Sequence, residues 1–80
     1  MENIDPILGK NLERIRKDKG MTREVLAEAL GISSQQVWKY ERGQDRLSGS
    51  RLWQLTDALG CNLLELFEGA PEPASMEKAS

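Results

Sequence analysis

The chain has 80 residues, enough for one domain near the lower size at which a hydrophobic core supports itself. A hydrophobic content of 39% and a charged content of 30% are typical of a globular protein, with no membrane-spanning run and no signal-peptide pattern, so we expect a cytoplasmic protein. One cysteine excludes an intramolecular disulfide, and the lack of histidine argues against a metal site; no cofactor is expected.

The net charge of −2 is unevenly distributed along the chain. Residues 10–51 contain ten Lys and Arg against six Asp and Glu, a net charge of +4. Residues 52–80 contain one Lys against five acids, a net charge of −4, and residues 1–9 add two acids. Phosphate binding requires a local basic face rather than a basic protein, so the first part of the chain is suited to a nucleic acid.

The first predicted helix begins at Asp5-Pro6, with Asp5 as N-cap and the proline in the first turn. Apolar residues then recur at helical spacing as far as Ile15, and charged residues lie between them. Gly20 ends this helix.

Residues 22–43 predict two short helices joined by a tight turn. Thr22 is a suitable N-cap for the first of them, and Gly31 ends it in a left-handed conformation. Ser33 begins the second helix, and Gln36 three residues later predicts a capping box.

The second helix of this pair has only a narrow apolar face, made by Val37 and Tyr40. Its other side chains are of the kinds that bind base edges, stack or neutralise phosphate. The pattern predicts a helix-turn-helix, and the alternative is an ordinary helical hairpin with a solvated face.

Two further helices are expected, the first from the N-cap Ser48 through Leu59. Asn62 and Glu65 predict a second capping box, which opens a fifth helix through about Glu68. Cys61 is expected to fill space between them. The fold prediction is an all-α domain, a compact five-helix bundle over residues 1–69, followed by a flexible, disordered tail over residues 70–80.

The segment ISSQQVWKYERGQDRLSGSRLWQLTDALG resembles the QQVxKYERGxxRxSxSRL pattern of the xenobiotic-response-element (XRE) family of helix-turn-helix regulators, which includes phage Cro and repressor proteins. The resemblance extends from about Gly9 to Phe67. It implies the phage-repressor-like DNA-binding fold and transcription regulation in a bacterium or phage. It also implies an ion pair between Arg16 and Glu41, which would lock the first helix to the recognition helix; two exposed charges are the alternative.

In this family the N-terminal half of the recognition helix, here residues 33–42, enters the major groove. Ser34, Gln35 and Lys39 match the family's base-contacting positions. Gln35 has the groups to bind adenine and Lys39 those to bind guanine, while Gln36 reaches either a base or the backbone. Trp38 replaces the family's usual glutamine, and it is expected to contact a thymine methyl, a sugar or a partner protein.

Phosphate contacts are expected where helix N-termini present free N–H groups. Thr22 and Arg23 begin the first helix of the motif, and Arg23 stands where the family usually has glutamine. The further candidates are Ser33, Arg42, Arg46, Ser50 and Arg51. For each of these the alternative is a solvated surface side chain.

One module of this size covers too few base pairs to specify a genomic site, which predicts a homodimer on an inverted repeat with recognition helices about 34 Å apart. Surplus apolar residues supply the interface candidates Trp53, Leu63, Leu66 and Phe67. Alternatively, Trp53 and Phe67 complete the core.

The function predicted from these features is that of a DNA-binding transcriptional regulator, a repressor that occupies its operator. RNA polymerase or another protein is a possible further partner, and no membrane is involved. The alternative is an antitoxin or anti-regulator that binds a protein through the acidic tail. An enzyme is not expected, because histidine, a cysteine–base pair and a phosphate-binding glycine loop are all missing from the sequence.

Overall fold

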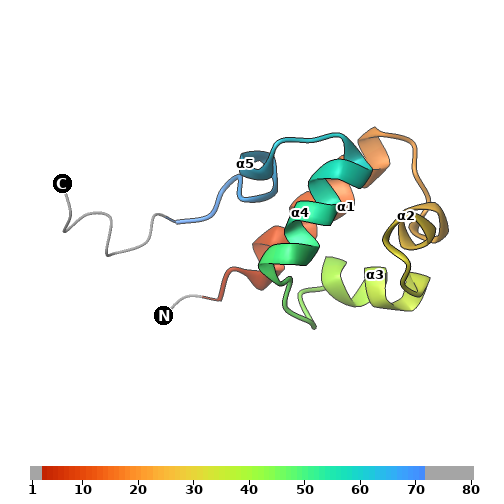
Figure 1. Ribbon diagram of the computed structural model, residues 1–80. Coiled ribbons are helices and arrows are strands. Elements are labelled where there is room, and N and C mark those ends of the chain that lie inside the picture. The colour runs from red at the N-terminus through yellow and green to blue at the C-terminus, as the bar shows by residue number, and fades with distance from the viewer. Residues whose placement is uncertain (1–2, 72–80) are drawn as a thin grey trace.

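The computed structural model describes residues 3–71 (Figure 1). Within this range the chain forms α1 (Asp5–Asp18), α2 (Arg23–Leu30), α3 (Ser34–Glu41), α4 (Gly49–Leu59) and α5 (Leu63–Leu66). The described residues contain no strand, so the predicted all-α five-helix fold is confirmed. None of the helices in this part of the chain is both long and apolar enough to cross a membrane. Most of the predicted tail, residues 72–80, lies outside the described residues.

Polar side chains begin the later helices, as the sequence predicts. Thr22, Ser33 and Ser48 each accept a hydrogen bond from the backbone N–H three residues further on, at 3.1 Å. Asn62 caps α5, and the Glu65 carboxylate returns to the Asn62 N–H at 3.3 Å, which completes the predicted capping box. These caps satisfy N–H groups that have no partner within their helix.

The start of α1 differs from the prediction. Asp5 is the first helical residue and not the N-cap, a position that Ile4 occupies without a side-chain hydrogen bond. The side-chain oxygen of Asn3 accepts from the Asp5 N–H at 3.1 Å instead. The Asp5 carboxylate still lies in the first turn, where the helix dipole favours negative charge.

The fifth helix is a single turn that ends at Leu66, shorter than the predicted helix through Glu68. The side-chain amide of Asn11 on α1 donates to the backbone oxygens of Leu66 and Glu68, each at 2.8 Å. These carbonyl oxygens already accept hydrogen bonds from Asn11. Further helical hydrogen bonds to them would therefore add little stability.

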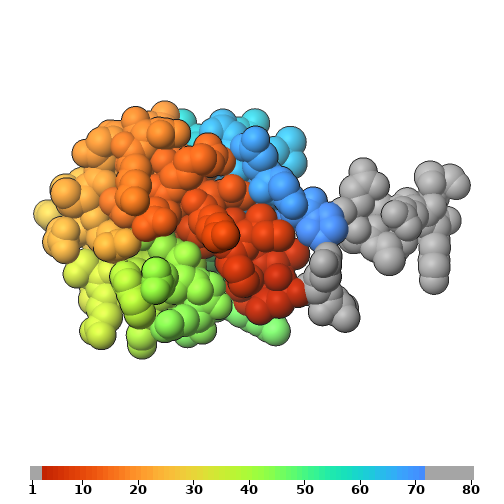
Figure 2. All heavy atoms as spheres, turned by 180° about the vertical axis from the view of Figure 1, so that it is seen from behind, coloured from red at the N-terminus to blue at the C-terminus, as the bar shows by residue number. Residues whose placement is uncertain are grey.

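The core is a cluster of buried side chains from all five helices. α1 packs on α3 and α5, α2 packs on α3 and α4, and α4 packs on α5. Seen from behind, α1 crosses the molecule between the α2–α3 end and α5 (Figure 2). At the α1–α3 crossing a Cβ on Gly9 would overlap the carbonyl oxygens of Tyr40 and Glu41, so the close approach requires glycine. The core residues are Leu8, Leu12, Ile15, Leu26, Ala27, Val37, Tyr40, Leu55, Leu59 and Leu66.

Candidate nucleic-acid interface

The inner face of α3 is held to α1 by a buried ion pair. Arg16 Nε donates to Glu41 Oε2 at 2.6 Å, and its Nη2 donates to Oε1 at 3.3 Å. The side chains of Arg16 and Glu41 are only 7% and 1% exposed. Arg16 Nη1 also donates to the Met21 carbonyl at 2.8 Å, which ties the α1–α2 turn to the same pair. The pair therefore has the geometry that locks α1 to α3.

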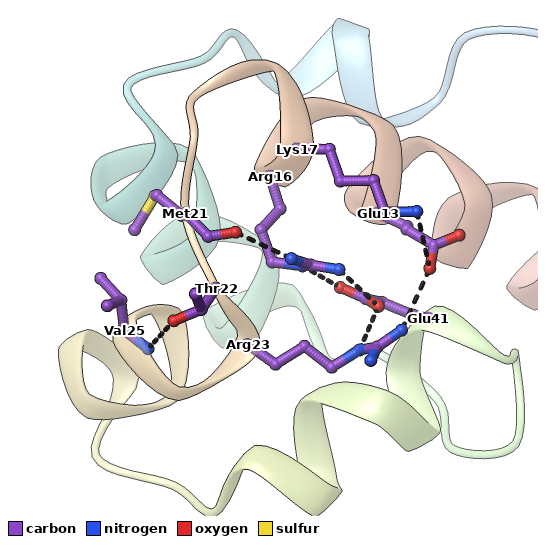
Figure 3. A network of polar contacts seen from close by, with 8 residues as sticks. All are labelled: Glu13, Arg16, Lys17, Met21, Thr22, Arg23, Val25 and Glu41. Carbon is purple, nitrogen blue, oxygen red and sulfur yellow. Dashed lines mark hydrogen bonds and ion pairs between the residues drawn. The ribbon is translucent and has the colours of Figure 1, made fainter.

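Arg23 on α2 binds the same carboxylate from a second direction (Figure 3). Its Nε donates to Glu41 Oε1 at 2.7 Å, and its Nη2 donates to Glu13 Oε2 at 3.1 Å. Lys17 Nζ lies 3.7 Å from Glu13 Oε2. Positive and negative side chains thus alternate from Lys17 through Glu13, Arg23 and Glu41 to Arg16. We call these five side chains the charge network; it links α1, α2 and α3.

This arrangement gives Arg23 a different setting from the phosphate contact that the sequence predicts. The hydrogen bond to Glu41 is the main cause of a raised pKa for Arg23, although partial burial lowers it. The guanidinium is therefore held in its charged form by carboxylates of the protein. With Nε and Nη2 both engaged, the guanidinium is oriented by carboxylates of α1 and α3.

The outer face of α3 carries the predicted base-contacting side chains. Gln35 and Trp38 are exposed, whereas Ser34 and Lys39 are half-buried. The Arg42 guanidinium lies over the Trp38 indole, 5.3 Å from its centroid, at a distance typical of a cation–π contact. An attraction of this kind restrains both side chains on one side of the helix.

An open hollow of about 360 Å³ lies between the N-terminal turns of α2 and α3. The residues that line it are Arg23, Glu24, Ser34, Gln35 and Trp38. Three of the five predicted base-contacting residues therefore meet at one depression of the surface.

Gln36 lies to one side of this group. Its side-chain nitrogen donates to Asp45 Oδ2 at 2.7 Å, so α3 is tied to the loop that follows it. The capping box predicted with Ser33 is incomplete, because the Gln36 side chain bonds to Asp45 rather than to the backbone of the cap.

The remaining predicted phosphate contacts are spread over the loop and α4. The side chain of Arg46 is 91% exposed, and its Nε lies 3.7 Å from Asp5 Oδ2. Arg51 Nη1 donates to the side chain of Gln54 at 2.9 Å, on its own helix. The hydroxyls of Ser50 and Ser48 are 3.2 Å apart. Thr22 and Ser33 lie at the surface as the caps of α2 and α3.

The HTH_3 family model, described as helix-turn-helix, matches residues 12–66, most of the chain. The chain belongs to this helix-turn-helix family. The predicted XRE-type membership is thereby confirmed.

Relatives of this family extend the match over most of the chain. An uncharacterized HTH-type transcriptional regulator of Rickettsia conorii is 38% identical over 72 residues, which are 90% of this chain and 58% of that protein. One of Sinorhizobium fredii is 36% identical over 69 residues, 86% of this chain and 48% of that protein. The chain spans about half the length of these curated relatives.

Solved structures share the fold. The clp gene regulator ClgR from Corynebacterium glutamicum superposes with a TM-score of 0.78 at 31% identity, over 84% of this chain and 87% of that chain. The restriction-modification controller protein C.AhdI from Aeromonas hydrophila gives a TM-score of 0.73 at 34% identity, over 78% and 94% of the two chains. Together with the helices described above, these likenesses confirm the predicted fold class.

The α4–α5 end of this helix-turn-helix protein exposes apolar side chains. Trp53 is 74% exposed, Leu63 42% and Leu64 75%; Leu64 was not among the predicted interface residues. Phe67 is half-buried against the core. The prediction of Leu66 as an interface residue is wrong: the single turn of α5 points this side chain inward, and it is fully buried.

Two further polar side chains, those of Asn11 and Arg23, have partners that were not predicted from the sequence. Asn11 is buried and holds the α5 backbone. The signal for it was present, because Asn11 lies four residues before Ile15 on the apolar face of α1. The partners of Arg23 left no comparable signal, because Glu13 and Glu41 lie 10 and 18 residues away and meet it only in the fold.

Proposed function

We propose that this protein is a sequence-specific DNA-binding regulator that inserts α3 into the major groove as a homodimer. The observation that carries the proposal is the division of α3 between its two faces. Glu41 anchors the inner face to Arg16 and Arg23. The outer face presents Gln35 and Trp38 to solvent. A rigidly held helix with uncommitted polar groups outside is what base recognition needs.

Within this proposal Gln35 contacts base edges most directly. A glutamine amide can bind adenine N6 and N7 together, and Lys39 can donate to guanine O6 and N7. Ser34 lines the same hollow as Gln35, and its shorter side chain would make a less discriminating contact. Gln36 is held by Asp45, so it positions the loop after α3 and contacts the backbone or a base only at the edge of the interface.

Phosphates would lie along the helix N-termini on either side of α3. The caps Thr22 and Ser33 leave further first-turn N–H groups free for an anion. Arg42 and Arg46 add positive charge at the end of α3 and in the following loop. Ser50 and Arg51 begin α4 and complete the set. We leave Arg23 out of it, because its guanidinium binds Glu13 and Glu41.

Self-association would use the exposed surface of Trp53, Leu63 and Leu64, with Phe67 at its edge. Solvent-exposed tryptophan and leucine side chains on α4 and α5 favour a protein contact. A two-fold dimer would then present two α3 helices to an inverted repeat, about 34 Å apart. Such a dimer represses transcription by occupying the operator, in the compartment that holds the chromosome, the cytoplasm of a bacterial cell.

Selection of bound sequences from a random duplex pool tests this proposal. We expect an enriched inverted repeat, and Gln35→Ala should lose preference at one position in each half-site. Gln44→Ala removes an exposed amide outside α3 and serves as the matched control. If the folded protein enriches no sequence, the DNA proposal fails and a protein partner becomes the better explanation.

Sedimentation at micromolar concentrations tests the dimer separately. Leu64→Asp should give a folded monomer, because a buried carboxylate at the interface lacks a partner. Val25→Asp places the same charge on another exposed apolar side chain, 51% accessible on α2, and should leave the dimer intact. A dimer that survives Leu64→Asp would show that another surface associates.

A further inference from the structure

Trp38 is a large apolar side chain on a helix face that is otherwise polar. It is 36% exposed, so a substantial part of the indole faces solvent. The Arg42 guanidinium restrains the ring at 5.3 Å, and the ring also borders the hollow between α2 and α3. The protein therefore holds an indole in place at the surface where its neighbours Ser34 and Gln35 meet the same hollow.

The charges around the hollow argue against a phosphate as its occupant. Arg23 lines it, but two nitrogens of this guanidinium already bind Glu41 and Glu13. Glu24, which also lines it, adds a carboxylate that repels phosphate. A neutral, partly apolar group fits this surrounding better than the sugar-phosphate backbone.

The major-groove edge of an A·T pair supplies such a group. It presents adenine N7 and N6, then thymine O4 and the thymine C5-methyl, in that order across the groove. Gln35 and Trp38 are three residues apart on α3, so their side chains are neighbours on the helix surface. An amide that binds adenine and an indole that covers a methyl thus stand next to each other.

We propose that the hollow beside Trp38 is a binding site for the C5-methyl of a pyrimidine, which makes Trp38 a specificity-determining residue for thymine. The inference rests on the proposed binding of α3 in the major groove. Arg42 acts as a positioning residue, since it holds the indole from outside the hollow. A 5-methylcytosine carries the same methyl group and would satisfy the same contact.

Replacement of thymine by deoxyuridine tests the site, because it removes the methyl and leaves base pairing unchanged. Each thymine of the selected operator is replaced in turn, and the dissociation constant is measured at fixed salt. We expect one position in each half-site to weaken binding about fourfold, the effect of one buried methyl group. In Trp38→Ala the thymine and uracil duplexes should bind equally.

Three variants separate the outcomes. Trp38→Phe keeps an apolar ring and should keep the thymine preference, which guards against a folding defect in Trp38→Ala. Val25→Ala removes another exposed apolar side chain, 51% accessible on α2, and should leave the ratio between thymine and uracil unchanged. Gln35→Ala should lose adenine preference and still distinguish thymine from uracil.

The failures are distinguishable. An operator that is bound specifically, but in which no thymine methyl matters, overturns the methyl site and leaves the DNA proposal standing. A methyl effect that persists in Trp38→Ala assigns the contact to another residue and also overturns the inference. If no operator is enriched at all, the proposed function itself has failed.

Discussion

The two ends of the molecule are built in opposite ways. At the α2–α3 end, Arg16 and Glu41 are buried within the charge network, and the outer surface carries polar side chains beside exposed Val25 and Trp38. At the α4–α5 end, a single amide, that of Asn11, ties α5 to α1, and the outer surface carries exposed Trp53 and Leu64. The α2–α3 end therefore suits a polar partner, which would contact α3. The α4–α5 end suits an apolar partner surface, which would cover Trp53 and Leu64.

The difference shows why a small domain buries charge at all. A buried ion pair is often no more stabilising than apolar residues of the same volume, because desolvation offsets its attraction. Its hydrogen bonds are directional, however, so they add geometric specificity to the packing of the helices. Glu41 binds two arginines from two helices, so α3 is positioned with respect to both α1 and α2.

The largest loss of stability is expected when the buried carboxylate of the charge network, that of Glu41, is removed. Glu41→Ala leaves Arg16 buried without its partner and should lower the free energy of unfolding by about 3–5 kcal/mol. Urea denaturation measures it, and Glu28→Ala, an exposed carboxylate on α2, should stay within about 0.5 kcal/mol of the wild type. A loss below about 1 kcal/mol for Glu41→Ala would show that the network adds little.

The α5 end should respond to Asn11. Asn11→Ala removes the hydrogen bonds to the carbonyls of Leu66, in α5, and of Glu68, just after it, and should cost about 1–3 kcal/mol of unfolding free energy. Because α5 carries Leu63 and Leu64, the variant dimer should also be weaker. Sedimentation should show it dissociating at a higher protein concentration than the wild type. Lys10→Ala, on the exposed side of α1, is the control. Loss of stability without any change in dimerisation would place the interface elsewhere.

Arg23 should affect geometry and not phosphate binding. Arg23→Gln is expected to leave the slope of log affinity against log salt unchanged, because the guanidinium binds Glu13 and Glu41. Arg46→Gln, at an arginine whose side chain is 91% exposed, should reduce that slope by about 1 if it contacts phosphate. A reduction of about 1 in Arg23→Gln would assign Arg23 to the phosphate contacts after all.

The smallest effect concerns Cys61, between α4 and α5. Burial is the main cause of a raised pKa for this thiol, and the negative charge of Glu65 adds to it. Since the folded pKa exceeds the unfolded value, the contribution of Cys61 to stability is full below about pH 8 and is lost as pH rises through the folded pKa. Alkylation by iodoacetamide at pH 8 should be slower than for a free cysteine.

Asn11→Ala should accelerate that alkylation, because loosening α5 exposes the thiol. The same substitution should not change the exposure of Trp38, measured by fluorescence quenching in a Trp53→Phe background. Equal changes at both ends would mean that the two regions open together.

The helices and most of their caps were predictable because their signals are local. Thr22, Ser33 and Ser48 lie within three residues of the N–H groups that they cap. The predicted start of α1 and the predicted length of α5 were wrong. Asn3 accepts a hydrogen bond from the first turn of α1, and Asn11 donates to the carbonyls of Leu66 and Glu68. In the site, the exposure of Gln35 followed from helical spacing, while the partners of Gln36 and Arg23 did not.

By itself the sequence determined the five helices, the narrow inner face of α3 and the basic charge around it, because periodicity, caps and composition act over a few residues. Tertiary structure alone decided the partners of Arg23 and Asn11, polar side chains that bond across helices. Arg23 meets Glu41 across 18 residues of sequence, and Asn11 meets Leu66 across 55. Hydrogen bonds of this range depend on the angles between packed helices, which no local pattern encodes. For the same reason only the fold could bury Leu66 and leave Leu64 exposed.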